Sequence, residues 1–279
     1  MKTSPLPSEL IQNLVRAALA EDIGAGDITT ESVIPAEARA EASIIAKEPC
    51  IVAGLPLAEA VFTELGARLT PVVAEGERAE NGQRVCSITG SARAILTGER
   101  TALNFLQRLS GIATLTREFV EAVAGTKVKI LDTRKTTPTL RALEKYAVAV
   151  GGGQNHRLGL FDAVMIKDNH RAILSRLGDA VDNARRLYSK APVIIEADTC
   201  EQVEEALAAG ADHILLDNMS LDELREAVAL IAGRAKTEAS GGVRLANVAD
   251  IAATGVDYIS VGALTHSARA VDFSLEIEP

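Results

Sequence analysis

The 279-residue sequence predicts an α/β protein, in which a parallel sheet with flanking helices curls towards a barrel behind a smaller N-terminal α+β domain. Two observations carry this prediction. Beyond residue 126, six apolar strand-like runs alternate with helix-like stretches, as in repeated βα units. Between residues 28 and 87, short strand-like runs instead cluster around one helix-like segment. Right-handed crossovers repeated over six strands favour a barrel, and an open doubly wound sheet is the alternative.

The pattern of the N-terminal part predicts a helix followed by strands. Apolar residues at helical spacing predict an amphipathic helix from residue 8 to about residue 22, which Gly24 and Gly26 end. Asn81-Gly82 predicts a hairpin turn among the strands that follow. Those strands are expected at residues 42–46, 69–73 and 84–88, with one helix at 56–65.

Helical periodicity then returns in two stretches, at residues 91–110 and 113–124. Leucines line one side of the first stretch, and a polar stripe that includes Arg100 lines the other. From spacing alone, that stripe fits an ordinary solvated face. The predicted domains are therefore residues 1–112 and 113–267, with the C-terminal tail 268–279 as a candidate addition to the first.

Six strands and five helices are expected in the second domain. The predicted strands are residues 127–131, 163–167, 193–197, 213–217, 236–240 and 258–262. The predicted helices are residues 139–150, 179–189, 201–208, 221–231 and 246–253. Thr137 is expected to cap the first of these helices, with Pro138 at its first position. The glycines at 151–153 would end it and return the chain towards the strand ends.

Each predicted strand is apolar in its body and ends in reactive or hydrogen-bonding groups. In a parallel barrel these carboxyl ends converge on one mouth, where barrel enzymes place their active sites. The polar groups at or just after the strands include Asp132, Thr133, Arg134, Lys135, Lys167, Asp168, Glu196, Asp198, Asp217, Ser240, Gly241, Gly242 and Gly262. We therefore expect the functional site at this mouth.

The charge pattern indicates an anionic small molecule as the ligand. The chain has 29 basic and 38 acidic residues, a net charge of −9, yet residues 131–170 hold six basic and four acidic side chains, a local charge of +2. Arginine pairs well with planar carboxylates, and glycine-rich strand ends can hold a phosphate with backbone N–H groups. The overall acidity argues against nucleic-acid or membrane-surface binding. Three cysteines without metal-like spacing and no signal-type or membrane-spanning apolar run predict a soluble cytoplasmic protein.

Several residues allow two interpretations. Glu196 and Asp217 could hold Mg²⁺ or ribose hydroxyls, or could be structural caps. Lys167 could form a Schiff base, or could be a plain cation for phosphate or carboxylate. His213 and His266 lack a comparable setting, and packing or capping is expected for both.

An ordered set of motifs resembles the quinolinate phosphoribosyltransferase family over nearly the whole chain. The motifs are ERTALN at 99–104, DTRKTTP at 132–138, GGGxNHR at 151–157, IKDNH at 166–170, EAD at 196–198, LDN at 216–218, EASGG at 238–242 and GALTHS at 262–267. The resemblance implies an incomplete TIM-like parallel α/β barrel with an N-terminal α+β sandwich-like domain. It implies transfer of phosphoribosyl from phosphoribosyl pyrophosphate to quinolinate, giving nicotinate mononucleotide, pyrophosphate and CO₂ in NAD biosynthesis.

The same resemblance assigns roles to residues. The residues expected to act in catalysis are Lys135, His156, Lys167, Glu196 and Asp217. Substrate binding is expected from these and from Arg100, Thr133, Arg134, Arg157, Ser240, Gly241, Gly242, Val261, Gly262 and Ala263. Mg²⁺ is the implied cofactor, with Glu196 and Asp217 as direct or indirect metal-site residues. The resemblance also implies a homo-oligomer, at least a dimer, in which Arg100 reaches the neighbouring subunit's site.

Three rival functions fit parts of the pattern. The nearest is a relative of similar fold encoded with molybdate transport genes, although the combination of Arg134, Lys135, His156 and Arg157 favours quinolinate. A non-catalytic anion-binding barrel would bind quinolinate without releasing pyrophosphate. An aldolase that used Lys167 would form an imine with its substrate, and borohydride would trap that imine as a stable adduct. We expect no such adduct.

Overall fold

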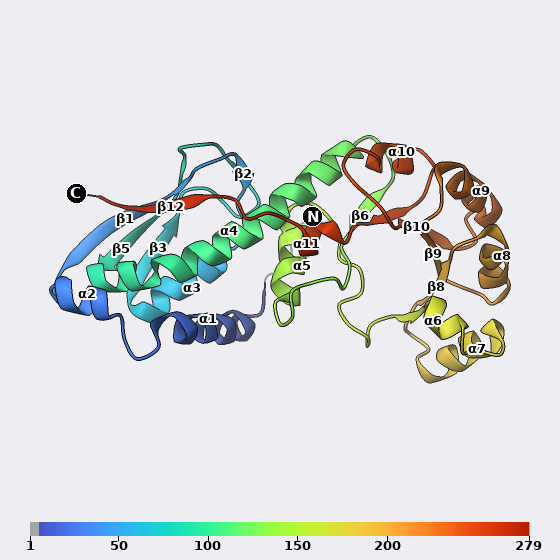
Figure 1. Cartoon of the computed structure of the whole chain (residues 1–279), viewed down its shortest axis with the longest axis horizontal. Coiled ribbons are helices and arrows are strands. Elements are labelled where there is room, and N and C mark those ends of the chain that lie inside the picture. The colour runs from blue at the N-terminus through green and yellow to red at the C-terminus, as the bar shows by residue number, and fades with distance from the viewer. Residues whose placement is uncertain (1–5, 279) are drawn as a thin grey trace. The chain divides into compact units, whose positions relative to one another are not determined.

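The computed structural model describes residues 6–278, and its chain divides into two compact units. Unit 1 comprises the residues up to Arg117, the segment Ala142–Gly152 and the chain from Ser267 on. Unit 2 comprises Glu118–Arg141 and Gly153–His266. Each unit is built around its own main sheet (Figure 1). Within the described residues, no helix is both long and apolar enough to cross a membrane.

Unit 1 has an antiparallel sheet in the order β12-β1-β5-β3 and a small sheet that pairs β2 with β4. The strands are β1 (Arg39–Ala46), β2 (Cys50–Ile51), β3 (Ala67–Pro71), β4 (Arg78–Ala79), β5 (Arg84–Ser91) and β12 (Phe273–Ile277). The helices are α1 (Ser8–Ile23), α2 (Ile28–Val33), α3 (Leu55–Leu65), α4 (Ala92–Ala122) and α5 (Arg141–Val150), the last two crossing the division between units by a few residues.

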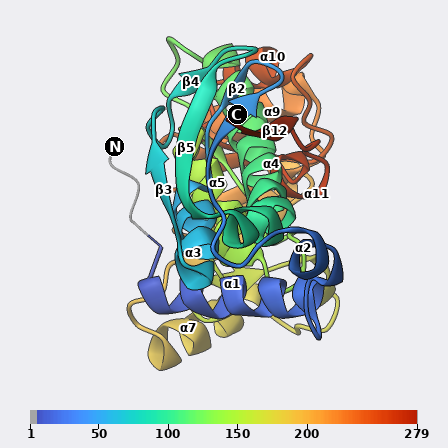
Figure 2. The same cartoon turned by 90° about the vertical axis from the view of Figure 1, so that its left-hand side faces the viewer.

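An aliphatic core holds unit 1 together. Ile44 and Ile88 from the sheet, Phe62 from α3 and Leu103 and Leu106 from α4 are almost fully buried in one cluster. Figure 2 shows this unit end-on, with α1 packed along α3. Burying side chains of this kind contributes roughly 1.5–3 kcal/mol each. The core therefore compensates for the scarcity of aromatic residues in the sequence.

Helix α4 is continuous where the sequence predicts two helices with a break near residue 111. A Cβ on Gly111 would lie 2.0 Å from the carbonyl oxygen of Arg269. This glycine therefore permits close approach of the C-terminal segment to the helix rather than ending it. The predicted domain boundary between residues 112 and 113 lies within this helix, and unit 1 continues to Arg117.

Two other local predictions were wrong. A turn forms at Asn81-Gly82, but it joins β4 and β5, which belong to different sheets, so it makes no hairpin. Helix α5 begins at Arg141, three residues after Pro138. Thr139 has a φ of +68°, in the left-handed region, so the helix cannot start at Thr137-Pro138 as expected.

Unit 2 contains the predicted parallel sheet, with its strands in the order β6-β11-β10-β9-β8-β7. The strands are β6 (Lys129–Leu131), β7 (Val164–Ile166), β8 (Val193–Ala197), β9 (His213–Asp217), β10 (Lys236–Ser240) and β11 (Tyr258–Ser260). The helices are α6 (Asp168–Arg171), α7 (Leu177–Leu187), α8 (Cys200–Ala208), α9 (Leu221–Ile231), α10 (Val248–Ala252) and α11 (Ala263–His266). Figure 1 shows α8 and α9 on the outer side of the sheet.

The strand order confirms an incomplete barrel and excludes the doubly wound alternative. Strands β7 to β11 follow one another in sequence order. β6, the first strand of this sheet along the sequence, pairs with β11, its last strand. A doubly wound sheet would instead reverse direction at a switch point. The ring is open between β6 and β7. Gln154 makes a parallel bridge to Leu131 on the free side of β6, so the chain after α5 runs along that opening.

Candidate active site

Polar residues from separate strands share the inner face of the sheet of unit 2. Cα partners in neighbouring parallel strands point to the same side, and Asp217 is the partner of Ser240. By the same rule, Glu196 shares this face with Leu215. Leu215 joins Met165 and Ile194 in a buried apolar cluster below the carboxyl ends of the strands. The sheet therefore presents an apolar floor with polar groups at the carboxyl-end rim, as expected.

Lys167 and Glu196 form an ion pair at this rim. Lys167 Nζ lies 2.6 Å from Glu196 Oε2, and the backbone N–H of Asp168 donates to Glu196 Oε1 at 3.4 Å. The Glu196 side chain is 8% exposed and that of Lys167 is 44% exposed. The lysine can thus hold a buried carboxylate with one side while its ammonium remains accessible. This pairing supports the plain-cation interpretation of Lys167 over an imine-forming amine.

Arg134 and Arg157 place two positive charges close together. Burial and then the nearby charge of Arg134 lower the pKa of the Arg157 guanidinium. Nε of Arg134 is buried without a hydrogen-bond partner, whereas Arg157 Nη1 donates to the carbonyl of Ala163 at 3.3 Å. Two half-buried guanidiniums with unused donors are suited to an anion with more than one carboxylate.

Two loops are fixed beneath these arginines. The fully buried Asp132 accepts a hydrogen bond from the backbone N–H of His156 at 2.8 Å. The backbone N–H of Arg157 donates to His156 Nδ1 at 2.7 Å. Arg141 adds a second link, since its guanidinium donates to Thr136 Oγ1 at 3.0 Å and to the carbonyl of Leu158 at 3.2 Å. The segments after β6 and before β7 are therefore held together.

Lys135 lies over the glycine that follows β11. A Cβ on Gly262 would lie 3.1 Å from Lys135 Cδ and 3.2 Å from His266 Nε2. Thr265 Oγ1 donates to the carbonyl of Lys135 at 2.7 Å and fixes the backbone of the loop. His266 is exposed, so of the two roles expected for it, packing or capping, packing does not apply. His266 lies four residues after Gly262, about one helical turn further along α11. This spacing was the sequence signal that could have predicted its position next to Gly262.

The loop after β10 has a backbone that only glycine adopts readily. Gly241 has a φ of +92°, and a Cβ there would lie 2.1 Å from Asn218 Oδ1. Asn218 in turn donates to Asp217 Oδ2 at 2.7 Å, and its backbone N–H donates to the carbonyl of Ser240 at 2.9 Å. Gly242, also at positive φ, is exposed with nothing near the position of a Cβ. The backbone here is thus open to a ligand.

Acidic side chains gather near Glu196 and Asp217. Burial first, and then the charges of Asp217, Glu196 and Asp168, raise the pKa of Asp198. Their mutual repulsion would favour a cation. In residues 6–278, however, no three histidine, cysteine or acidic side chains are grouped as metal ligands. Glu196 is already paired with Lys167, so these residues fit a Mg²⁺ ion held mainly by ligand oxygens rather than by a protein cage.

The remaining predicted residues also have defined places. Thr133 accepts a hydrogen bond from the backbone N–H of Lys135 at 3.0 Å, and the backbone N–H of Val261 donates to the carbonyl of Leu131 at 2.9 Å. Ala263 begins α11. Arg100 belongs to unit 1, where it is exposed on α4.

Sequence reasoning missed two residues of the inner face, the fully buried Glu238 and the partly buried His213. His213 Nε2 lies 3.0 Å from Glu238 Oε2, and His156 Nε2 lies 3.3 Å from the same oxygen. The expectation of ordinary packing for His213 overlooked this partner. A glutamate in the middle of a buried strand was the available signal, because an unpaired buried carboxylate is costly.

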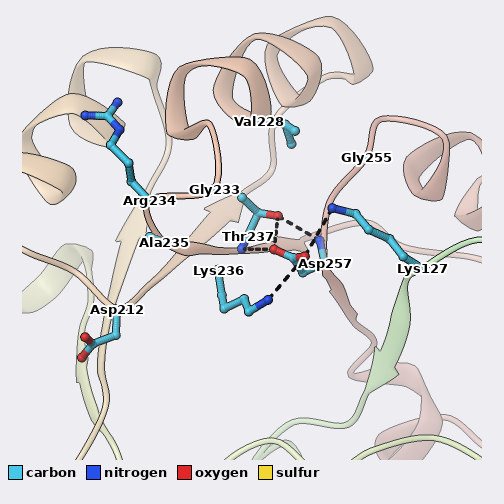
Figure 3. Close-up of a pocket in the computed structure, with 10 residues that line it drawn as sticks. All are labelled: Lys127, Asp212, Val228, Gly233, Arg234, Ala235, Lys236, Thr237, Gly255 and Asp257. Atoms are coloured by element: carbon cyan, nitrogen blue, oxygen red, sulfur yellow. Dashed lines mark hydrogen bonds and ion pairs between the residues drawn. The ribbon is translucent and has the colours of Figure 1, made fainter.

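A pocket at the opposite end of the strands is structural. Figure 3 shows Asp257 between Thr237, Lys127 and Lys236, near the amino ends of β9 and β10. The backbone N–H and hydroxyl of Thr237 both donate to Asp257 Oδ2 at 3.1 Å, and Lys127 Nζ donates to Oδ1 at 3.3 Å. This network joins β10 to the turn before β11 and lies away from the polar mouth.

Replacing Asp257 with Asn is expected to lower stability at neutral pH by about 1 kcal/mol, through loss of charge-assisted hydrogen bonds. Burial would raise the pKa of Asp257, but hydrogen bonds from Thr237 and Lys127 outweigh it and leave that pKa below its usual value. Its stabilisation is therefore present above the unfolded-state pKa and is lost as the pH falls through the folded-state pKa. Thermal unfolding between pH 7 and pH 3 should show the stability difference between wild type and Asp257→Asn becoming smaller as the pH falls. Asp250→Asn, at an exposed position, should show no stability difference from wild type. A gap that is constant with pH would contradict this assignment.

Comparison with known proteins gives a consistent result over the whole chain. Residues 27–110 match the family model "Quinolinate phosphoribosyl transferase, N-terminal domain", and residues 112–276 match the corresponding C-terminal domain. The chain is 45% identical to "Nicotinate-nucleotide pyrophosphorylase [carboxylating]" of Mycobacterium leprae, covering 95% of this chain and 96% of that one. It is 44% identical to the probable enzyme of that name from Bacillus subtilis, with 96% and 93% covered.

Solved structures agree. The nicotinate-nucleotide pyrophosphorylase of Francisella tularensis superposes with a TM-score of 0.95 at 39% identity, over 100% of this chain and 99% of that chain. The enzyme so named from Ehrlichia chaffeensis gives a TM-score of 0.92 at 41% identity, with both chains fully covered.

Proposed function

Because this chain belongs to the quinolinate phosphoribosyltransferase family through both its N-terminal and C-terminal domains, we propose the following division of labour at the mouth of unit 2. The enzyme transfers phosphoribosyl from phosphoribosyl pyrophosphate to quinolinate with decarboxylation, forming nicotinate mononucleotide for NAD biosynthesis. The observation that carries the site assignment is the pair of half-buried guanidiniums, Arg134 and Arg157, together with the Lys167–Glu196 ion pair at the carboxyl ends of β7 and β8.

The arginine pair binds the two carboxylates of quinolinate. Arg134 retains a buried Nε without a partner, and Arg157 is repelled by its neighbour, so a dianion satisfies both donors and charges at once. Lys167 supplies a third positive charge. Direct contact of His156 with the substrate stays a prediction, since its Nδ1 accepts from the backbone and its Nε2 faces Glu238.

The donor's 5′-phosphate lies against the glycine-lined strand ends. Gly241 and Gly242 offer backbone N–H groups without side chains in the way, and Ser240 offers a hydroxyl. Lys135 extends over Gly262 from the other side, next to exposed His266. A phosphate between these two loops would meet both backbone donors and a cation.

Carboxylates near the ribose stabilise the transfer. The reaction centre gains oxocarbenium-like positive charge as pyrophosphate departs, and Glu196 and Asp217 can oppose that charge. Mg²⁺, when bound, neutralises the leaving pyrophosphate, and Asp217 and Asp198 can hold its water ligands. Loss of CO₂ follows glycosylation in this scheme, because the positively charged ring nitrogen stabilises the carbanion that the broken C–C bond leaves on the adjacent ring carbon, and a proton from water then takes the place of CO₂.

Measuring nicotinate mononucleotide, pyrophosphate and CO₂ from quinolinate and phosphoribosyl pyrophosphate tests the function. We expect all three products in equal amounts, and none when the donor is omitted. Quinolinate binding without pyrophosphate release would indicate a non-catalytic anion-binding protein. Absence of turnover with both substrates and Mg²⁺ would overturn the assignment. Repeating the assay after chelation with EDTA tests the metal requirement.

We also propose that the active enzyme is at least a homodimer, in which Arg100 contributes to the neighbouring subunit's site. The support is the ERTALN motif around this exposed residue on α4. Arg100→Ala and Arg157→Ala should each be inactive alone. Mixed subunits should recover up to about one quarter of the wild-type activity, because random pairing yields half hybrids with one intact site each. Hybrids that form, as shown by differential tags, yet stay inactive would contradict a shared site.

A further inference from the structure

A carboxylate, Glu238, and His213 inside unit 2 have no part in the chemistry above, and His156 faces the same carboxylate. Glu238, on β10, is fully buried, and its Oε2 lies within ion-pair distance of Nε2 of both His156 and His213. Both contacts have the distance of an ion pair, and neither has the alignment of a hydrogen bond. Burial alone would raise the pKa of Glu238, but the two histidines outweigh it and hold that pKa well below its usual value. The two facing ring nitrogens therefore favour the anionic form of Glu238.

This group lies directly below the mouth. Glu238 and Ser240 are two residues apart on one strand, so their side chains share a face. Glu238 is the Cα partner of Leu215, and Asp217 is the partner of Ser240. The buried anion is thus one layer deeper than residues proposed to meet the substrates.

The position of His156 connects this layer to the arginine pair. Its Nδ1 accepts a hydrogen bond from the backbone N–H of Arg157, so the proton of the neutral ring is on Nε2, which faces Glu238. The backbone N–H of His156 is held by Asp132. The ring therefore has one fixed orientation, with Glu238 at one end and the backbone of Arg157 at the other.

We propose that Glu238, backed by His213, is a positioning residue for Arg157 and acts through His156. This inference rests on the proposed role of Arg157 in binding quinolinate. A carboxylate suits the position because it only accepts, so a single oxygen can face two N–H donors. An amide would turn a donor towards one histidine and favour a different tautomer or rotation of the ring. The segment carrying Arg157 would then lose its fixed place.

The first test compares Glu238→Gln with Glu226→Gln, a matched substitution at an exposed site on α9, in the full-length protein. For Glu238→Gln we expect Kd and KM for quinolinate to rise at least tenfold, while KM for phosphoribosyl pyrophosphate stays within twofold. Glu238→Asp should recover part of the loss, and Glu226→Gln should match the wild type. A folded Glu238→Gln protein with unchanged quinolinate affinity would overturn the proposal, as would equal weakening for both substrates.

The second test needs no variant. Nitrogen-15 NMR of labelled histidines in the wild-type protein reports which ring nitrogen carries the proton. The charged or titratable groups facing this site are Glu238, His213, Asp132 and Arg157, with Tyr258 against the His213 ring. We expect His156 to show an unprotonated Nδ1 and a protonated Nε2 near neutral pH. A signal typical of a solvent-exposed histidine with exchanging tautomers would overturn the proposal even if Glu238→Gln failed to fold.

The two tests separate this inference from the proposed function. If the wild-type protein shows the fixed tautomer but does not turn over quinolinate, the proposed function is refuted and the Glu238–His156 contact still stands. An active enzyme without the fixed tautomer would remove only the positioning role.

Discussion

Replacing Arg157 with Met is expected to abolish measurable quinolinate binding and to reduce kcat/KM by 10²-fold or more, on the order of the cost of removing one partner from a charge-assisted pair. The same change should leave the thermal unfolding midpoint equal or raise it. The reason is that Arg157 is half-buried beside Arg134, and the two charges repel each other until an anion arrives. Activity and stability should therefore move in opposite directions.

The matched control is Arg225→Met on the surface of α9, where the arginine forms an exposed ion pair with Asp222, three residues earlier in the helix. It should leave kinetics and stability near wild-type values, because an exposed ion pair contributes little. Arg157→Lys should keep the positive charge but lose the paired hydrogen bonds. Its quinolinate affinity and kcat/KM should therefore lie between those of Arg157→Met and those of the wild type. Calorimetric titration with quinolinate and differential scanning calorimetry measure both effects. An Arg157→Met protein that binds quinolinate normally would refute the assignment of the anion site.

Replacing Gly241 with Ala is expected to raise KM for phosphoribosyl pyrophosphate at least tenfold. The new Cβ would overlap Asn218 Oδ1, and the backbone would have to hold alanine at a φ of +92°. Left-handed backbone costs roughly 1–2 kcal/mol for a residue with a Cβ, and the overlap adds to it. Because Asn218 donates to Asp217, the shift should disturb the carboxylate near the ribose as well as the phosphate loop.

Two other glycines separate overlap from strain. Gly242→Ala, next in the same loop, meets no neighbouring atom and should have a smaller effect. Gly233→Ala has a φ of +75° and open space after α9, so it should lower stability slightly without changing kinetics. Steady-state kinetics with each substrate varied in turn distinguish these outcomes. If Gly241→Ala and Gly242→Ala behaved alike, the contact with Asn218 would have no kinetic role.

The regular strands and helices of unit 2 were the most predictable part of the fold. The bounds of β8, β9, β10 and α9 agree with the sequence prediction residue for residue. β8 and β9 have short central apolar runs, α9 begins at a capping serine, Ser220, and β10 ends directly before Gly241, so local pattern and tertiary environment agree. The strand order, with β6 beside β11, depends on contacts distant in sequence and could be expected only from the repetition of βα units.

Errors arose where one residue type serves two purposes. A helix break was expected between residues 110 and 113, but Gly111 there allows a distant carbonyl to approach a continuous α4. Thr137-Pro138 had the composition of a helix start, yet Thr139 takes up left-handed backbone and delays α5 to Arg141. Asn81-Gly82 formed its turn, but long-range pairing assigned the adjoining strands to different sheets.

The charged rim of the site was accessible to sequence reasoning, and its buried support was not. Arg134, Lys167 and Asp217 could be placed because strand ends in a parallel barrel meet at one mouth. Glu238 could be suspected from its place in the middle of a strand, but its partners could not be predicted, because a buried ion pair depends on side chains that face each other across strands. Arg141 likewise links two loops through contacts that no spacing rule describes.

The strand at the end of the chain has a consequence for synthesis. β12 pairs with β1 from Ala46–Phe273 to Ala42–Ile277, so unit 1 contains both the early and the last residues of the described chain. As the ribosome makes the protein, β1 must wait with one edge unpaired while every strand of unit 2 is produced. Unit 2 can therefore mature first, and a chain truncated before β12 would lose a strand from the unit whose other strands were translated earliest.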